Sequence, residues 1–124
     1  MGIIRQRFTL EGSRGKRGVE ILVDTGASEC LVQPELAEEL AILEDTAEPM
    51  SFDTSGQRDG LKAKERVMLD VRLNGQRHAA IFYVVPGLTE DAVIGAAFLQ
   101  CHRCRIDYNR KRLSIGKCCV RFRA

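Results

Sequence analysis

The sequence predicts an all-β domain with one or two short helices. Apolar and polar residues alternate along most of the chain, as they do in strands that bury one face, and Ile4, Phe8 and Leu10 form the first such set. The dipeptide Asn74-Gly75 stands between two further alternating segments and is typical of a type I′ hairpin turn. Helical periodicity is confined to two short segments, so strands dominate the prediction.

The first half of the chain is expected to form strands around one helix. A strand near Phe8 leads into the polar, Gly-rich segment EGSRGKRG, which predicts a turn, and a second strand ends in ILVD. A helix is predicted for PELAEEL, because Pro34 fits a first turn and Leu36, Ala37 and Leu40 lie on one side. A hairpin with a polar tip is then predicted for MSFDTSGQRDGLKA.

The second half is expected to alternate hairpins with one more helix. A hairpin is predicted for ERVMLDVRLNGQRHAAIFYVV and a loop for PGLTED. A short strand, a glycine and a short helix are predicted for AVIGAAFLQCH, a last hairpin for RIDYNRKRLSI, and a terminal strand for CCVRF. No repeat or linker composition divides the chain, so residues 1–124 are expected to form a single domain.

Composition and charge argue against several classes of protein. No apolar run approaches the length that a membrane-spanning helix needs, and the N-terminus lacks the apolar core of a signal peptide. The odd number of cysteines, five, favours free thiols, so the chain is expected in the cytoplasm or as a domain cut from a longer protein. The segment after Arg103 is basic but does not show the interleaved aromatic pattern of a single-strand binder, so nucleic-acid binding is not expected.

The segment ILVDTGAS carries the candidate site. Three apolar residues lead directly into Asp24, and an ionised carboxylate at such a place needs hydrogen-bond donors around it. Gly26 permits a tight turn and lets a backbone N–H approach the carboxylate, and the small Ala27 avoids crowding. The segment therefore predicts a fixed, partly desolvated carboxylate, although an Asx turn that merely closes a strand has the same sequence.

A second segment, VIGAAFL, strengthens this prediction, because an apolar strand there ends in Gly95 and continues at once into a helix. Together, ILVDTGAS and VIGAAFL resemble the retropepsin-like aspartic proteases, the single-domain family that includes the retroviral proteases. The segment RIDYNRKRLSI is similar to the strand-turn-strand that follows the helix in that family. The resemblance extends from about Val19 to Ile115 and implies a closed β-barrel of the acid-protease fold that works as a homodimer.

The same resemblance implies an aspartic endopeptidase. Peptide hydrolysis by this chemistry needs two carboxylates that hold one water, and this chain has one Asp-Thr-Gly and no room for a second lobe. The second Asp24 is therefore expected from a second copy across a two-fold axis, and the monomer is expected to be inactive. The implied partners are a second copy and a peptide or unfolded protein substrate, and no metal or cofactor is implied.

The roles of the loop residues follow from the resemblance. Asp24 is the expected catalytic carboxylate, Thr25 is expected to join the two loops across the dimer, and Gly26 to offer backbone groups to carboxylates and substrate. Ala27 cannot donate the hydrogen bond that Ser gives in pepsin-like enzymes, so activity is expected at mildly acidic to neutral pH. The expected active-site loop comprises Thr25, Gly26, Ala27 and Ser28, and the expected supporting loop comprises Ile94 and Gly95.

The hairpin predicted for MSFDTSGQRDG occupies the position of the flap, the hairpin that closes over bound peptide in this family. Ser55, Gly56 and Gln57 are expected at its tip. The hairpin also contains the sequence DTSG, but no apolar strand leads into Asp53 and turn residues are common at a hairpin tip. Asp53 is therefore not expected to be catalytic.

The cysteines and histidines offer an alternative to a metal-free site. Cys101 and Cys104, which form a CxxC motif, could hold zinc together with Cys118-Cys119, but the second pair is adjacent and strand alternation would send its side chains to opposite faces. Structural zinc is therefore the less favoured interpretation. His78 has no acid–base partner in a recognisable motif and is expected to be a surface residue.

A non-catalytic interpretation of the same fold also stays open, because a dimerisation or peptide-binding module could keep the Asp loop without cutting a substrate. Substrate pockets are expected to be lined by side chains such as Val32, Ile81 and Val93. The β-prone terminal segments MGIIRQRFTL and KCCVRFRA could interleave in a dimer sheet, although this match is one of position only.

Overall fold

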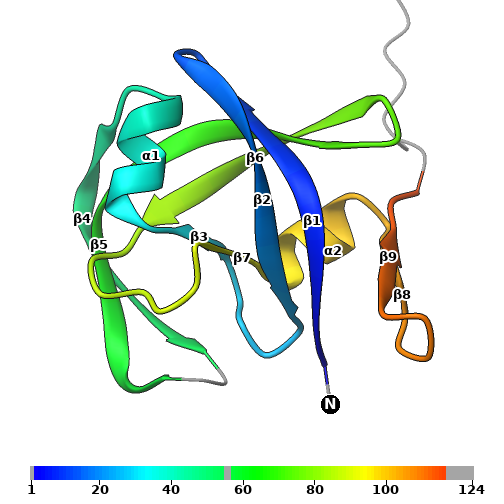
Figure 1. Cartoon of the computed structure of the whole chain (residues 1–124). Helices are drawn as coiled ribbons and strands as arrows, with labels where there is room; N and C mark the ends of the chain where they lie inside the picture. The colour runs from blue at the N-terminus through cyan, green and yellow to red at the C-terminus, as the bar shows by residue number, and fades with distance from the viewer. Residues whose placement is uncertain (1, 55–56, 117–124) are drawn as a thin grey trace, which may run out of the picture.

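The structure, a computed structural model, describes residues 2–54 and 57–116, with the backbone alone for residues 53–54 and 57–60. Its main sheet has seven strands in the hydrogen-bonded order β1-β2-β7-β3-β6-β5-β4, and β1 also pairs with β5. Strands β1, β2, β7, β3, β6 and β5 therefore close into a barrel, and β4 extends it from the edge of β5 (Figure 1). The closed, mostly β barrel with two short helices confirms the predicted fold class.

The elements have the following bounds. The barrel strands are β1 (Ile3–Gly12), β2 (Gly15–Asp24), β3 (Cys30–Val32), β5 (Gln57–Leu73), β6 (Gln76–Val84) and β7 (Ala92–Ile94). Outside the barrel lie β4 (Glu44–Thr54) and the separate two-stranded sheet of β8 (Arg105–Asp107) and β9 (Arg112–Ser114). The helices are α1 (Pro34–Leu40) and α2 (Ala96–Cys101).

The β1–β2 hairpin keeps one unbroken register, from Ile3 opposite Asp24 to Gly12 opposite Gly15. Its inward residues Ile4, Phe8 and Leu10 are buried, as the alternation predicts. The turn is shorter than the predicted polar segment, because the two strands pair as far as Gly12 and Gly15. The turn is also bonded to the end of α1, since the N–H of Arg14 donates to the carbonyl of Leu40 over 2.8 Å.

The N-terminal segment is thus a barrel strand within its own chain. Its second edge pairs with β5 over Thr9–Glu11, so further pairing, such as in a dimer sheet, would have to use the residues before Thr9. Most of the segment KCCVRFRA, and with it the predicted strand CCVRF, lies outside the described residues.

The β4–β5 hairpin confirms the hairpin predicted around residues 50–63. Its register runs from Glu44 opposite Arg66 to Thr54 opposite Gln57 and shifts twice, between Asp45 and Met50 and between Phe52 and Thr54. Of the three residues expected at the tip, Gln57 belongs to β5, and Ser55 and Gly56 lie outside the described residues.

The β5–β6 hairpin contains the predicted type I′ turn, since Asn74 and Gly75 have φ values of 55° and 81°. The expectation that His78 lies at the surface is wrong. The register places His78 opposite the buried Val71, on the inward face of the strand, and its side chain is 7% exposed. Alternation counted from the turn carries this information, but the polarity of histidine favoured the opposite face.

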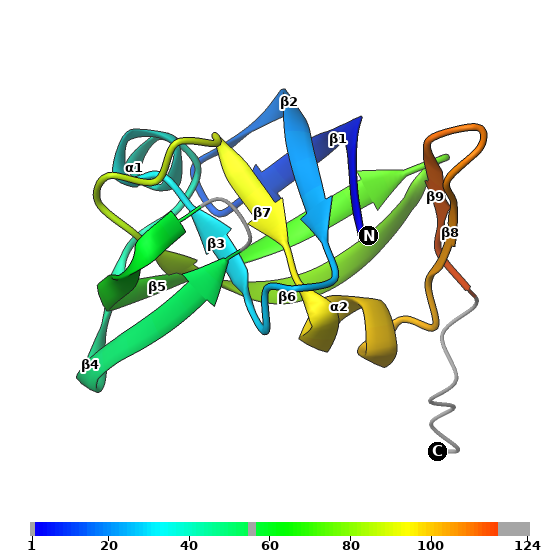
Figure 2. The same cartoon turned by 90° about the horizontal axis from the view of Figure 1, so that it is seen from below.

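The two helices lie where the sequence predicts them. Helix α1 has Pro34 in its first turn and buries Leu36, Ala37 and Leu40. Helix α2 buries Phe98, and the predicted hairpin β8–β9 adds Leu113 to the same core. Figure 2 shows α1 and the β8–β9 hairpin on opposite sides of the barrel, with α2 between them. Neither helix of the described chain has the length and apolar character that a membrane crossing requires.

Two groups of buried apolar side chains hold the fold. The larger group fills the barrel and includes residues of β1, β2, β5, β6 and both helices. A smaller group, called here the second cluster, joins the β4–β5 hairpin to the strand ends near Asp24. The second cluster consists of Leu22, Ala27, Leu31, Phe52, Leu61, Ala63, Val85, Leu88 and Val93.

Candidate active site

Asp24 is the last residue of β2 and is 1% exposed. Its Oδ1 accepts a hydrogen bond from the backbone N–H of Gly26 over 2.8 Å, and its carbonyl accepts the N–H of Ala27 over 3.1 Å. The first of these bonds has the spacing of an Asx turn. The Asx turn and the fixed carboxylate are therefore one arrangement, in which the turn itself supplies a donor to the buried acid.

Strand β7 lies beside the strand that carries Asp24. It pairs in parallel with β2, Val93 opposite Leu22 and Ile94 opposite Val23, and in antiparallel with β3. Ile94 is fully buried. Two segments that are far apart in the sequence, ILVDTGAS and VIGAAFL, thus lie side by side, as the resemblance implies.

The second half of the Asp loop is hydrogen-bonded to the start of α2. The N–H of Ala96 donates to the carbonyl of Ala27 over 2.7 Å, and the N–H of Ala97 to the carbonyl of Ser28 over 2.9 Å. The first N–H groups of a helix have no partner within the helix, so these loop carbonyls satisfy them. The loop and the helix thereby fix each other.

Gly95 permits this close approach. A Cβ atom at this position would lie 2.7 Å from the carbonyl oxygen of Ala27 and 2.8 Å from the carbonyl carbon of Glu29, distances that real Cβ atoms do not show. The glycine at the end of the apolar segment is therefore required by the backbone that faces it.

The first half of the Asp loop is held by the start of the chain. The N–H of Thr25 donates to the carbonyl of Gly2 over 2.8 Å. The exposed side chain of Thr25 lines a surface hollow together with Leu99 of α2, Ile106 of β8 and Tyr108 of the turn after β8. Sequence reasoning did not identify Gly2, because the contact follows from the register of β1 on β2 and from no motif.

The second cluster connects the Asp loop with the predicted flap. Ala27 of the loop shares it with Phe52 and Leu61 of the β4–β5 hairpin. The ring of Phe52 also packs on Tyr83 of β6, with centroids 5.1 Å apart. Both the hairpin and the Asp loop lie at the lower end of the barrel in Figure 1. The side chains that Asp53 and Gln57 carry lie outside the described part.

The residues expected to line substrate pockets do not share a surface. Val32 is fully buried in the barrel, and Val93, at 1% exposure, is buried in the second cluster. Ile81 is exposed and lines a cavity of about 290 Å³ between β6 and α2, together with Tyr83, which also packs on Phe52 of the second cluster. Burial of whole strands, which the sequence did not reveal, separates the three.

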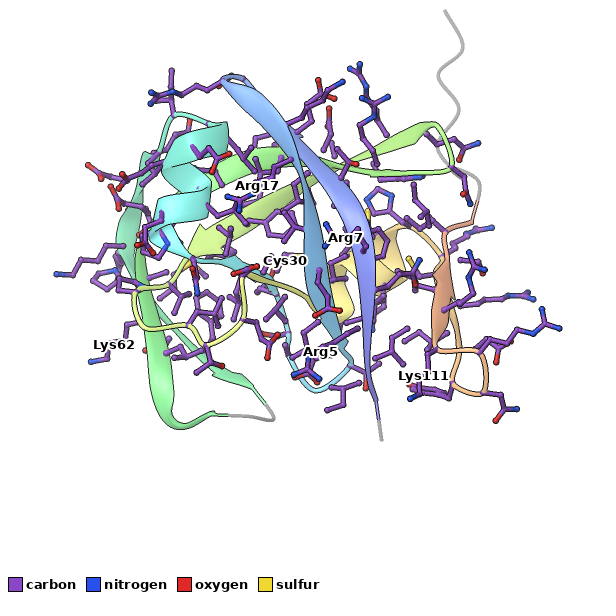
Figure 3. All side chains as sticks on the ribbon, in the orientation of Figure 1. Arg5, Arg7, Arg17, Cys30, Lys62 and Lys111 are labelled. Carbon is purple, nitrogen blue, oxygen red and sulfur yellow. The ribbon has the colours of Figure 1, made fainter. Side chains whose placement is uncertain are left out.

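The described cysteines are free and do not gather with other metal-binding side chains. Cys30 lies inside the barrel (Figure 3), where burial raises the pKa of its thiol to about 12. Burial, with the nearby Cys101, raises the pKa of Cys104 to about 11. Among residues 2–54 and 57–116, no group of three or more His, Cys, Asp or Glu side chains is placed to hold a metal ion. Cys118-Cys119 lies outside the described residues.

The two histidines contact each other across the space between β6 and α2. The rings of His78 and His102 meet edge to face with centroids 5.3 Å apart, and His102 also packs on Phe98 at 4.4 Å. The Nε2 of His102 lies 3.2 Å from the carbonyl oxygen of Ala79. Burial, and then the proximity of His102, lowers the pKa of His78. The pair joins α2 to the barrel wall, away from the Asp loop.

Comparisons with known proteins agree with this geometry. A sequence model of the PEG10/RTL1 protease domain matches residues 20–121. A comparison with curated proteins gave no significant match. Among solved structures, the crystal structure of the retroviral protease-like domain of Ddi1 from Leishmania major is similar, with a TM-score of 0.65 and 20% sequence identity over 93% of this chain and 89% of that chain. At this identity the likeness concerns the fold, which is retropepsin-like.

Proposed function

Because the chain belongs to the PEG10/RTL1 family of protease domains, we propose that it is an aspartic endopeptidase that works as a homodimer. The observation that carries the proposal is the position of Asp24, a buried carboxylate at the end of β2 whose Oδ1 accepts the N–H of Gly26. Family membership alone gives a protease domain. The activity, the dimer and the catalytic role of Asp24 are the proposal.

Two Asp24 carboxylates, one from each copy, would hold the attacking water. One carboxylate takes a proton from the water while the oxygen of that water bonds to the peptide carbonyl carbon, and the other, protonated, gives its proton to the carbonyl oxygen. The carboxyl that took the proton from water then gives it to the nitrogen as the C–N bond breaks, and the other carboxylate takes back a proton from a hydroxyl of the tetrahedral intermediate, which leaves as the carboxylic acid product. No metal or cofactor takes part in this scheme.

The other loop residues would support this chemistry. Thr25, which is exposed, would join the two Asp loops across the dimer, and Gly26 would hold the carboxylates through its backbone. Ile94 and Gly95 would support the loop from below, a role that agrees with the pairing of β7 on β2. Because Ala27 offers no side-chain donor, we expect activity at mildly acidic to neutral pH.

The β4–β5 hairpin would cover the substrate, with Ser55, Gly56 and Gln57 at its tip. The second cluster supports this role, because it packs the base of the hairpin against Ala27 of the Asp loop. We further propose that residues 1–124 act as one domain and that the compartment is reducing, as in the cytoplasm, which the free thiols of the described cysteines favour.

The test compares the purified chain with its Asp24→Asn variant on an unfolded protein substrate from about pH 4 to about pH 8. The variant keeps the shape of the side chain but loses the acid, so we expect its rate to fall at least about a hundredfold. Asp70→Asn, a carboxylate change on β5 remote from the loop, serves as the control and should leave the rate unchanged. Activity of the wild type should also rise more steeply than linearly with enzyme concentration.

The main alternative is a non-catalytic dimerisation or peptide-binding module of the same fold. It would be supported if wild type and Asp24→Asn were both folded dimers, neither cut the substrate at any pH, and both bound an unfolded peptide equally well.

A further inference from the structure

We infer that Gly2 is a positioning residue for Thr25, fixing the first half of the Asp loop as α2 fixes the second half. The geometry is independent of the proposed function. The consequence for dimerisation and catalysis rests on that function, since it is there that Thr25 joins two Asp loops.

The register of β1 on β2 brings Gly2 to the loop. Ile3 pairs with Asp24, so the residue before Ile3 stands beside the residue after Asp24. The carbonyl of Gly2 there accepts the N–H of Thr25 over 2.8 Å. This bond continues the β1–β2 ladder one step beyond Asp24 and fixes the plane of the Asp24–Thr25 peptide.

The lack of a side chain at Gly2 leaves the space that Thr25 fills. A Cβ atom on Gly2 would overlap the Oγ1 of Thr25 and lie 2.7 Å from its Cβ and 3.0 Å from its Cγ2. The clash includes the Cβ, which a rotation of the Thr25 side chain does not move, so the backbone of one partner would have to shift. Gly2 does not have a positive φ, so space rather than backbone conformation is the reason for glycine.

The Asp loop is therefore held at both of its ends by distant parts of the chain. Gly2 fixes the N–H of Thr25, and Ala96 and Ala97 of α2 fix the carbonyls of Ala27 and Ser28. Between the two lies Gly26, whose N–H reaches the Asp24 carboxylate. A shift of the Thr25 backbone would also move Gly26, which follows it directly in the chain, and would change the hydrogen bond from the Gly26 N–H to the Asp24 carboxylate. It would also change the position in which Thr25 meets a second copy of the chain.

The matched control is Gly15, at the other end of the same hairpin. A Cβ on Gly15 would have a single neighbour within 4 Å, the carbonyl oxygen of Glu39 at 3.8 Å, which is ordinary contact. Gly2→Ala and Gly15→Ala thus make the same chemical change in the same hairpin, but only Gly2→Ala is expected to displace Thr25.

The experiment measures amide hydrogen exchange by NMR on the full chain. In the wild type, the Thr25 N–H should be protected, because it is hydrogen-bonded. In Gly2→Ala, we expect it to exchange at least about tenfold faster, with shifted Thr25 and Gly26 resonances, whereas Gly15→Ala should match the wild type. Sedimentation should show that Gly2→Ala also raises the dimer dissociation constant at least about tenfold, with a corresponding loss of peptide cleavage.

The inference is overturned if Gly2→Ala and Gly15→Ala give the same Thr25 exchange rate and the same dissociation constant. If Gly2→Ala does not fold, the double variant Gly2→Ala/Thr25→Gly replaces it, because glycine lacks the Cβ, Oγ1 and Cγ2 atoms that the new side chain would meet. Recovery of the fold supports the inference, and failure to recover overturns it. If the wild type cuts no peptide while Thr25 exchange still depends on Gly2, the proposed function fails and the positioning role stands.

Discussion

The β1–β2 and β4–β5 hairpins are built from the same kind of element and differ in regularity. The first keeps one register from the turn to Asp24, and β1 pairs on both edges, with β2 and with β5. The second shifts register twice, and within the described residues β4 pairs with β5 alone. A strand paired on both sides cannot move without opening the barrel, whereas an edge strand with bulges can adjust locally. The comparison indicates a rigid β1–β2 hairpin that carries Asp24 and a more adaptable β4–β5 hairpin.

The buried residues of the two hairpins follow the same division. Phe8 of β1 belongs to the large group inside the barrel, and Phe52 of β4 belongs to the second cluster near the Asp loop. Both are almost fully buried, at 2% and 6% exposure. Replacing each phenylalanine therefore measures the loss of the same side chain, once in the doubly paired strand β1 and once in the edge strand β4.

The largest expected effect comes from truncating these two rings. Phe8→Ala should lower the free energy of unfolding by about 3–5 kcal/mol, because the closed barrel cannot collapse around the cavity. Phe52→Ala should lower it by about 1–2 kcal/mol, because β4 can relax, and should raise KM for peptide instead. Urea unfolding and peptide kinetics measure the two effects. Equal losses of stability would show that the hairpins are equally rigid and would break the comparison.

A smaller loss of stability is expected when the pH is lowered, because of the buried His78 in the barrel strand β6. Both histidines of the chain lie there or on α2, and burial lowers the pKa of His78. As pH falls through the ordinary histidine range near about 6.5, the unfolded chain binds a proton that the folded chain does not. The stability from neutral His78 is therefore lost as pH falls from there toward the lowered pKa, by at most about 1.4 kcal/mol per pH unit.

His78→Phe keeps a ring against His102 and removes this titration. Comparing urea unfolding of the variant and the wild type at about pH 7 and about pH 5 measures the contribution of His78 together with its interaction with His102, since groups remote from the pair titrate alike in both. A wild type that loses no more stability than His78→Phe over this interval would contradict the assignment.

The smallest effect is expected from one ion pair in each region. Arg72 and Glu11, 3.2 Å apart, join β5 to β1 where the barrel closes, and Arg66 and Glu44, 3.5 Å apart, join β5 to β4. The first pair is the less exposed. Glu11→Gln should therefore cost up to about 1 kcal/mol and Glu44→Gln close to nothing, as judged by urea unfolding at low salt. If Glu44→Gln lowered the free energy of unfolding more than Glu11→Gln, the β4–β5 hairpin would contribute more to stability than its irregular pairing indicates.

Local patterns were sufficient to predict most elements from the sequence. The alternation of Ile4, Phe8 and Leu10, the turn at Asn74-Gly75 and the helix after Pro34 each depend on neighbours a few residues away, and the structure has all of them. The pairing of the segment before Asp24 with the segment before Gly95 came from the resemblance, because no local pattern specifies which strands lie side by side.

The sequence did not reveal features that depend on remote partners. No sequence pattern singles out Gly2, because its contact with Thr25 follows from strand register. The inward position of His78 followed from the alternation of β6, but its polarity outweighed that pattern. Ile81 lies apart from Val32 and Val93 because Ile81 is exposed on β6, whereas Val32 is buried inside the barrel and Val93 is buried in the second cluster.

The two attachments of the Asp loop have a consequence for the order in which the chain matures. The attachment to Gly2 joins nearby parts of the sequence and can form as soon as the first hairpin does. The attachment to Ala96 and Ala97 needs a helix that the ribosome delivers much later, and contacts between remote segments form slowly. A nascent chain that ends before α2 can therefore make the attachment to Gly2 alone, and the loop has both attachments only after Ala96 and Ala97 have been added.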